Sequence, residues 1–256
     1  VVQWGTLPKQ RTALGTLADI ADRAAGMEAP AILVVGEVAA LRAQLQWFEN
    51  RPLFGRCVVV TRSRTQASEL CEQLEGLGAE VLEMPTIRIE PPADLAPLDE
   101  AIARLASYDW VVFTSVNGVD AFFERLERAG KDARALPAVA AIGPATCQRL
   151  KERGIRADCQ PQRFTGAELV AALSAREPLA GRRILLPRAA EAPEAVPKGL
   201  ADAGATVDEV PAYRTAIAES ADEETVQRLL AGEVDFVTFT SSSTVRGFVQ
   251  AVGAER

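Results

Sequence analysis

The same phrase stands twice in this chain, and its spacing constrains the fold more than any other feature. FTSVNGVDAFF begins at Phe113, and FTSSSTVRGFV begins at Phe239, 126 positions later. A second pair of segments, beginning at Leu53 and Leu179, keeps that offset without a gap. Matching residues recur through a strand, a helix, a glycine turn and a proline: Gly55 and Gly181, Arg56 and Arg182, Arg62 and Arg188, Leu74 and Leu200, Gly78 and Gly204, Val81 and Val207, Pro85 and Pro211. A constant offset across so many elements indicates an internal duplication.

Each copy of the duplicated unit has the pattern of an α/β fold. Apolar runs such as CVVVTR, WVVFTS, RILLPR and FVTFTS are typical of strands buried on both faces of a parallel sheet. Helical segments such as ELCEQLEGLG and PATCQRLKERG alternate with them. This alternation predicts right-handed βαβ units and parallel sheets.

The first 50 residues lie outside the duplication. Their apolar spacing predicts a helix over residues 12–25, a buried strand over 31–35 and an amphipathic helix over 37–48. The proline and glycine of NRPLFG then predict a linker before the first repeat.

Both ends of the sequence carry a further expectation. The chain begins with Val1 rather than Met, so we expect an incomplete N-terminus. The first unit continues through VAAIGPATCQRLKERGI (139–155), and the matching segment of the second unit would begin near position 265, beyond Arg256. We therefore expect one further strand and helix to be missing from this sequence.

Composition excludes several classes of function. The chain contains no histidine, which removes the commonest general base and the commonest metal ligand. Its cysteines (Cys57, Cys71, Cys147 and Cys159) show no CxxC spacing, so reduced thiols in a cytoplasmic protein are expected rather than a zinc site or a disulfide. The net charge of −7 argues against a general nucleic-acid binder. It leaves room for a small anionic ligand, because local donors decide binding in a cleft.

No part of the sequence looks like a membrane anchor or an export signal. A transmembrane helix needs about 18 or more consecutive apolar residues, and no run approaches that length. No signal peptide is visible. A soluble, cytoplasmic protein without membrane contact is the expectation.

Candidate ligand-binding residues stand where the predicted strands end. Ligands of open α/β sheets bind beyond the carboxyl ends of the strands, and hydroxyl residues at helix N-termini form anion sites. The strand ends supply Thr61 and Arg62, Thr114 and Ser115, Gly143 to Thr146, Pro187 and Arg188, and Thr240 to Ser243 with Ser241 and Ser242. Two alternatives stay open: that the hydroxyls only cap helices, and that the arginines only form structural ion pairs. No GxGxxG or GxxxxGK[ST] motif supports a nucleotide site.

Tyr213 is a further candidate for a functional role. It is one of two tyrosines and stands in VPAYRT, two residues after the repeated Pro211. A half-buried structural tyrosine is the alternative.

Seven phrases, in this order, resemble uroporphyrinogen-III synthase over residues 53–256: VVVTR, DWVVFTSVNGVDAFF, AAIGPATCQRL, FTGAELV, RILLPR, VPAYRT and DFVTFTSSSTV. Residues 1–50 resemble instead the C-terminal end of uroporphyrinogen-III C-methyltransferase, through WGTLPKQRTALGTL, PAILVVGEV and LQWF. The two resemblances together imply a fragment of a bifunctional fusion of tetrapyrrole enzymes.

The resemblance implies an α/β fold with two flavodoxin-like parallel-sheet domains and a substrate cleft between them. Residues 1–50 would be a methyltransferase remnant, residues 53–87 and 214–256 a discontinuous first synthase domain, and residues 88–213 the second. The implied enzyme is a lyase of haem, sirohaem and cobalamin biosynthesis. It closes hydroxymethylbilane to uroporphyrinogen III with inversion of ring D and loss of water. Neither a metal nor an organic cofactor is implied.

The resemblance also assigns roles to residues. Tyr213 matches the tyrosine proposed to assist departure of the hydroxyl, and Thr146 and Ser241 match cleft positions. Arg62, Thr114, Ser115, Asn117 and Gly118 lie on matching motifs. Residues 1–50 lack the glycine-rich S-adenosylmethionine loop, so methyl transfer is not expected in this chain. Functional coupling to porphobilinogen deaminase and to the fused methyltransferase domain would follow.

Two other functions are compatible with the same residues. A bilobal protein that binds a small anion without chemistry would use the same strand-end hydroxyls. The chain would instead serve mainly as the C-terminal half of a methyltransferase if the duplicated region had no function of its own. The length of the duplicated region argues against this. Substitution of Tyr213 by phenylalanine distinguishes an enzyme from a binder, because a binder has no turnover to lose.

Overall fold

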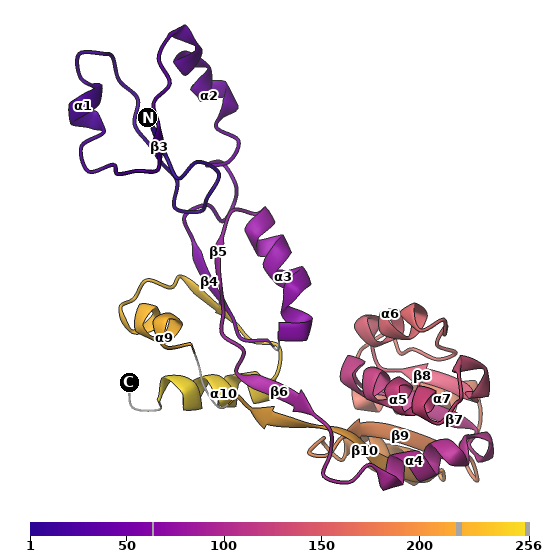
Figure 1. Ribbon diagram of the computed structural model, residues 1–256. Coiled ribbons are helices and arrows are strands. Elements are labelled where there is room, and N and C mark those ends of the chain that lie inside the picture. The colour runs from indigo at the N-terminus through magenta and orange to yellow at the C-terminus, as the bar shows by residue number, and fades with distance from the viewer. Residues whose placement is uncertain (63, 219–221, 254–256) are drawn as a thin grey trace. The chain divides into compact units, whose positions relative to one another are not determined.

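The computed structural model describes residues 1–62, 64–218 and 222–253. The chain divides into two compact units: residues 1–88 with 217–256, and residues 89–216 (Figure 1). The boundaries fall inside strand β6 (Ile87–Glu90) and at the end of strand β10 (Thr206–Ile217). No helix in the described ranges is long and apolar enough to cross a membrane.

The first 50 residues fold into short elements around a small antiparallel sheet of order β2-β1-β3. The elements are β1 (Val2–Gln3), β2 (Arg11–Thr12), α1 (Ile20–Arg23), β3 (Ala31–Ile32), the 3₁₀ helix η1 (Glu37–Leu41) and α2 (Arg42–Leu45). The helix predicted over 12–25 is therefore wrong except for one turn. Asp19 Oδ1 accepts hydrogen bonds from Thr16 N at 2.5 Å and Thr16 Oγ1 at 2.9 Å, so a side-chain turn replaces the helix at its start.

Two further expectations for this segment need correction. The strand predicted over 31–35 is neither long nor buried: β3 ends at Ile32, and Ile32 is 66% exposed. The helix predicted over 37–48 exists only as the two short turns η1 and α2. The spacing of apolar residues indicates which type of element a segment favours. A helix or strand becomes long and stable only where another surface packs against its apolar face, and the spacing does not show whether such a surface is present.

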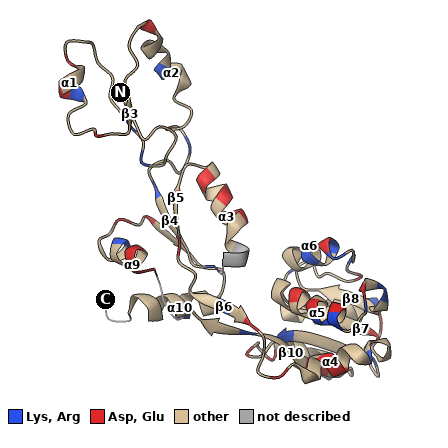
Figure 2. Cartoon of the chain, in the orientation of Figure 1, with Lys and Arg blue, Asp and Glu red and all other residues tan. Residues whose placement is uncertain are grey.

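The remainder of the first unit is a parallel α/β layer. Its sheet has the order β11-β4-β5 and consists of β4 (Cys57–Val60), β5 (Glu80–Glu83) and β11 (Phe236–Thr238), all parallel. Its helices are α3 (Arg64–Gly76), α9 (Glu223–Leu230) and α10 (Ser242–Val252). All four residues of β4 are buried, as the run CVVV predicts for a central strand. In Figure 2, β4 is tan while α3 carries a row of acidic residues.

The second unit is built on a five-stranded sheet of order β6-β10-β9-β7-β8. Its other strands are β7 (Trp110–Phe113), β8 (Ala138–Ala141) and β9 (Arg183–Ala189), and the β10–β9, β9–β7 and β7–β8 pairs are parallel. Its helices are α4 (Ala96–Ala103), η2 (Leu105–Ser107), α5 (Val116–Arg128), η3 (Ala133–Ala135), α6 (Pro144–Glu152), α7 (Gly166–Arg176) and α8 (Ala195–Asp202).

The two faces of this sheet hold two separate apolar cores. Val111 and Phe113 of β7 pack with residues of α4, α5 and α6. Trp110 and Val112 point to the opposite face and pack with residues of α7 and α8. Successive side chains of a strand alternate between faces, so β7 anchors both helix layers. The predicted two-domain α/β architecture with parallel sheets is confirmed.

The structure also confirms the duplication. The offset of 126 relates the first residues of four element pairs: β4 and β9, β5 and β10, β7 and β11, and α5 and α10. Strands β5-β4-β11 in one unit therefore repeat the neighbour order of β10-β9-β7 in the other. Gly78 and Gly204 adopt φ of +97° and +90°, where glycine is favoured, and a Cβ on Gly78 would lie 3.1 Å from Phe54 N.

Candidate functional site

The strongest candidate site lies at the carboxyl edge of the sheet in the second unit. Strands β7 and β9 are neighbours there, although β8 comes between them in the sequence. The strand order reverses at this point, and open α/β sheets bind ligands outside such a switch point. Thr114 and Ser115 follow β7, while Pro187 and Arg188 stand near the end of β9.

Ser115 joins the edge of the sheet to helix α5. Its backbone is extended, it is the N-cap of α5, and its Oγ accepts a hydrogen bond from the Gly118 N–H at 3.0 Å. The same Oγ accepts a second hydrogen bond, from the Tyr213 hydroxyl at 3.0 Å. Ser115 thus caps α5, and its hydroxyl also contacts the candidate catalytic residue Tyr213.

Tyr213 reaches this point from β10. Its side chain is 8% exposed, and its ring packs in the core that contains Val210 and Ala212. The register between β10 and β9 shifts between Pro211 and Tyr213, and such a bulge re-aims the side chains that follow it. A buried tyrosine hydroxyl requires a polar partner, and here that partner is Ser115.

Gly118 allows α5 to approach the end of β9 closely. A Cβ at this position would lie 3.1 Å from the Pro187 carbonyl oxygen and 3.2 Å from Ser115 Oγ. Ser115, Gly118 and Tyr213 are therefore held together by direct contacts. Thr114 and Asn117 are half-buried on the same stretch, and Thr146 is buried in the first turn of α6, which follows β8.

Arg188 is explained by contacts within the protein. It is 3% exposed, its Nη2 donates to the Pro193 carbonyl at 2.6 Å, and its Nη1 lies 3.2 Å from Glu209 Oε1. Nη1 completes no well-directed hydrogen bond within the described ranges. These contacts favour the structural alternative, and a substrate-binding role for Arg188 stays a prediction. Nothing in the sequence signals Pro193 or Glu209 as its partners.

Arg62, Ser241 and Ser242 belong to the other unit, at the equivalent edge of its sheet. Arg62 follows β4 and is half-buried, while Ser241 follows β11 and is exposed. Ser241 caps α10: its Oγ accepts from Thr244 N at 3.2 Å, and Thr244 Oγ1 accepts from Ser241 N at 3.2 Å. Ser242 is the first residue of α10 and is exposed.

The cysteines and carboxylates indicate no other reactive centre within the described ranges. All four cysteines are free, and burial raises the pKa of each thiol. No group of three His, Cys, Asp or Glu side chains among the described residues is placed to hold a metal ion.

The comparison with protein families identifies the chain. The family model described as uroporphyrinogen-III synthase HemD matches residues 68–256, which is most of the sequence. This chain belongs to the uroporphyrinogen-III synthase family.

Individual members of the family agree. The chain is 34% identical over 256 residues to the porphyrin biosynthesis protein HemD of Ruminiclostridium josui, an alignment that covers 98% of this chain and 51% of that protein. It is 37% identical over 207 residues to the uroporphyrinogen-III synthase of Synechococcus elongatus, covering 80% and 78%. The chain therefore spans about half the length of the Ruminiclostridium protein.

Solved structures share the fold. A mutant uroporphyrinogen III synthase from the extremely thermophilic bacterium Thermus thermophilus superposes with a TM-score of 0.55 at 21% identity, over 77% of each chain. The similarity to methyltransferases is partial: the uroporphyrinogen-III C-methyltransferase of Bacillus subtilis is 31% identical over 157 residues, which cover 60% of this chain and 32% of that protein. The fusion predicted from residues 1–50 stays a prediction.

Proposed function

We propose that the protein to which this chain belongs converts hydroxymethylbilane to uroporphyrinogen III, with inversion of ring D and release of water, as a lyase. One observation supports this most directly. In a member of the synthase family, the Tyr213 hydroxyl donates to Ser115 at the switch point between β7 and β9, where α/β sheets bind their ligands.

The proposed reaction needs two contributions from the protein: it must position the bilane, and it must supply a proton to the departing hydroxyl. The C–O bond of the hydroxymethyl group breaks, the oxygen leaves as water, and an azafulvene remains. Tyr213 would turn its hydroxyl hydrogen from Ser115 to the departing oxygen and protonate it, and Ser115 would then donate its own hydrogen to the phenol oxygen and hold the ring in place. The ring that attacks through its substituted carbon later loses a proton, which balances the one taken up by water.

The selectivity for ring D is a matter of orientation. An unguided azafulvene closes to the type I isomer, so the protein must hold the bilane folded with ring D turned. The substrate carries eight carboxylates, which need many donors. Helix N-termini and hydroxyls at the strand ends, including Ser115 and Ser241, would supply them without a basic surface.

The remaining assignments follow from the same resemblance. Residues 1–50 would be the remnant of a fused methyltransferase domain that transfers no methyl group in this chain. The whole protein would act in the cytoplasm and couple to porphobilinogen deaminase, which supplies the unstable bilane. Arg62, Thr114, Asn117, Thr146, Arg188 and Ser242 are proposed substrate contacts.

The two tyrosines allow a matched test of this proposal. We expect Tyr213→Phe to lower kcat for type III formation at least about tenfold, because the proton donor is lost. Tyr108→Phe is the control: Tyr108 donates to Asp208 at 2.6 Å before β7 begins, so its loss should cost stability but leave kcat unchanged. Steady-state kinetics and thermal unfolding of both variants measure this. An unaltered kcat in Tyr213→Phe contradicts the assigned role, and binding without turnover in the unsubstituted chain favours the anion-binding alternative.

A further inference from the structure

Helix α6 carries a groove that the proposed chemistry does not use. The groove has a volume of about 560 Å³ and is lined mainly by Pro144, Cys147, Gln148, Lys151, Arg156 and Gln160. The first four stand at positions i, i+3, i+4 and i+7 of the helix, so they form one face of it. The segment 156–160 after the helix forms the opposite wall.

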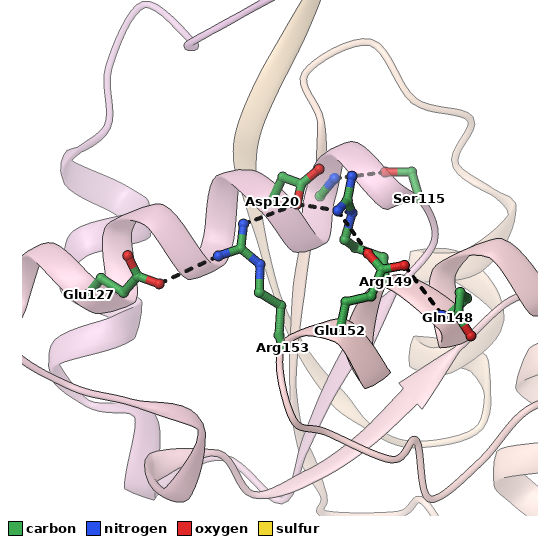
Figure 3. Close-up of polar contacts among 8 residues, drawn as sticks. Ser115, Asp120, Glu127, Gln148, Arg149, Glu152 and Arg153 are labelled. Carbon is green, nitrogen blue, oxygen red and sulfur yellow. Dashed lines mark hydrogen bonds and ion pairs between the residues drawn. The ribbon is translucent and has the colours of Figure 1, made fainter. Parts of the chain in front are cut away.

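Arg149 of α6 and Arg153, the C-cap residue of the helix, both form ion pairs with carboxylates. Arg149 pairs with Asp120 of α5 at 3.3 Å and with Glu152 at 2.8 Å (Figure 3). Arg153 pairs with Asp120 at 3.3 Å and with Glu127 at 3.5 Å. The pairs with Asp120 and Glu127 connect this end of α6 to α5, and both arginines have carboxylate partners within the protein.

The two cations in the groove are not neutralised in this way. Lys151 and Arg156 form no ion pair and donate no side-chain hydrogen bond to any residue in the described ranges. The nearest carboxylates along the chain are already engaged. Glu152 accepts from Arg149 and Gln148, and Asp158 Oδ2 accepts from Val139 N at 2.9 Å. In a chain of net charge −7, the groove is thus a local site of positive charge.

The groove begins at the sheet edge that carries Ser115 and Tyr213. Pro144 is the first residue of α6, three positions after the end of β8, and Ile142 N donates to Phe113 O at 3.0 Å. The carboxyl ends of β7 and β8 are therefore adjacent. Gln160 adds a polar group: its Oε1 accepts from Cys147 Sγ at 3.1 Å, which leaves its NH₂ group as a donor.

We propose that this groove binds carboxylate groups of a polycarboxylate ligand through Lys151 and Arg156. Resting on the proposed function, the ligand is the tetrapyrrole, and the groove holds carboxylate arms of the part that does not react. Such a contact is made equally in the substrate and the transition state, so it lowers KM and leaves kcat unchanged.

Charge-matched variants test the proposal. Lys151→Gln with Arg156→Gln removes both cations, and Lys198→Gln with Arg134→Gln removes two cations elsewhere in the same unit. Uroporphyrin III, a stable octacarboxylate, serves as a fluorescent probe at low and at high salt. We call Lys151→Gln with Arg156→Gln the groove variant. We expect it to bind uroporphyrin III with a Kd about three- to tenfold higher at low salt. Its KM for type III formation should rise similarly, while kcat is retained. Unchanged Kd and KM, or equal changes in the control variant, would overturn the proposal.

Cys147 provides an independent readout of the same groove. It lies in the lining and is the one cysteine of the four that is not buried. Uroporphyrin should slow alkylation of Cys147 by iodoacetamide in the unsubstituted chain and fail to do so in the groove variant, as measured by mass spectrometry. Alkylation at the same rate with and without the probe contradicts binding at this place.

The outcomes separate the groove from the proposed function. If the chain forms type III product and the variant without the two groove cations keeps its KM, the carboxylate-binding role of the groove is contradicted and the proposed synthase activity is supported. If neither this chain nor the full-length protein forms type III product but the probe still protects Cys147, the groove is a polycarboxylate site and the proposed synthase activity is contradicted.

Discussion

At the scale of single residues, the site depends on three groups that restrain one another. Ser115 caps α5 and receives the Tyr213 hydroxyl on the same oxygen. Gly118 supplies the capped N–H and leaves the space through which Pro187 O approaches α5. A change at any of these positions should therefore move the other two.

Substitution of Gly118 by alanine tests that coupling. The added methyl group would lie 3.1 Å from the Pro187 carbonyl, a main-chain atom that cannot move aside freely. We expect the free energy of unfolding to fall by about 1–3 kcal/mol and type III formation to fall with it. Gly76→Ala is the matched control, because a Cβ there meets nothing within 4 Å and helix propensity favours alanine by up to about 1 kcal/mol. Urea unfolding of both variants gives the comparison, and equal stability of Gly118→Ala and the unsubstituted chain contradicts the close approach.

At the scale of elements, an equivalent aspartate in each unit joins the starts of two neighbouring parallel strands, β7 and β9 in one unit and β11 and β4 in the other. Asp109, just before β7, accepts from Arg183 N at 2.8 Å and Arg182 Nη1 at 2.7 Å. Asp235, just before β11, accepts from Cys57 N at 2.8 Å and Arg56 Nη1 at 2.6 Å. The offset of 126 that relates the two units relates these aspartates as well.

The two aspartates predict an acid-sensitive fold. Hydrogen bonds from the strand N–H groups and the arginines lower the pKa of both Asp109 and Asp235 in the folded chain. A carboxyl group whose pKa is lower when folded stabilises the fold above its unfolded pKa of about 4, and this contribution is lost as the pH falls through the folded value. We expect the double variant Asp109→Asn with Asp235→Asn to be less stable at pH 7 and to lose less stability as the pH falls from about 4 to about 2. Thermal unfolding across that range measures this, and parallel pH profiles would contradict it.

Sequence patterns predict the central strands of the repeat well because β4 and β7 are buried on both faces. CVVV and WVVF are buried throughout, as their composition indicates. The sequence predicts both Ser115 and Tyr213 as candidate site residues, but the contact between them depends on a bulge in β10 that no local signal marks. The sequence of α6 and the segment after it shows several cations without showing which of them α5 neutralises, so it does not distinguish Lys151 and Arg156 from Arg149 and Arg153.

At the scale of the whole chain, apolar surface is unevenly distributed. More than half of the exposed large apolar side chains in the described ranges lie in the first 50 residues, among them Ile32, Leu33, Val35 and Trp47. Several of them line a cavity of about 570 Å³ in that segment. Exposed apolar patches of this kind bind apolar probes and promote association.

This distribution predicts where an apolar dye binds. We expect the chain to bind 8-anilinonaphthalene-1-sulfonate in its native state, and Leu33→Ser with Val35→Ser to weaken the dye fluorescence while the circular dichroism stays unchanged. Leu230→Ser, which changes an exposed leucine of α9, is the control. An equal decrease in the control would place the dye elsewhere.

The isomer ratio of the product tests the central claim most directly. The purified chain is mixed with porphobilinogen deaminase and porphobilinogen, the products are oxidised, and type I and type III uroporphyrin are separated by chromatography. Type III uroporphyrin above the enzyme-free background is the expected result, since only a protein that turns ring D gives it. Type I alone, both from this chain and from the full-length protein, would contradict the synthase assignment.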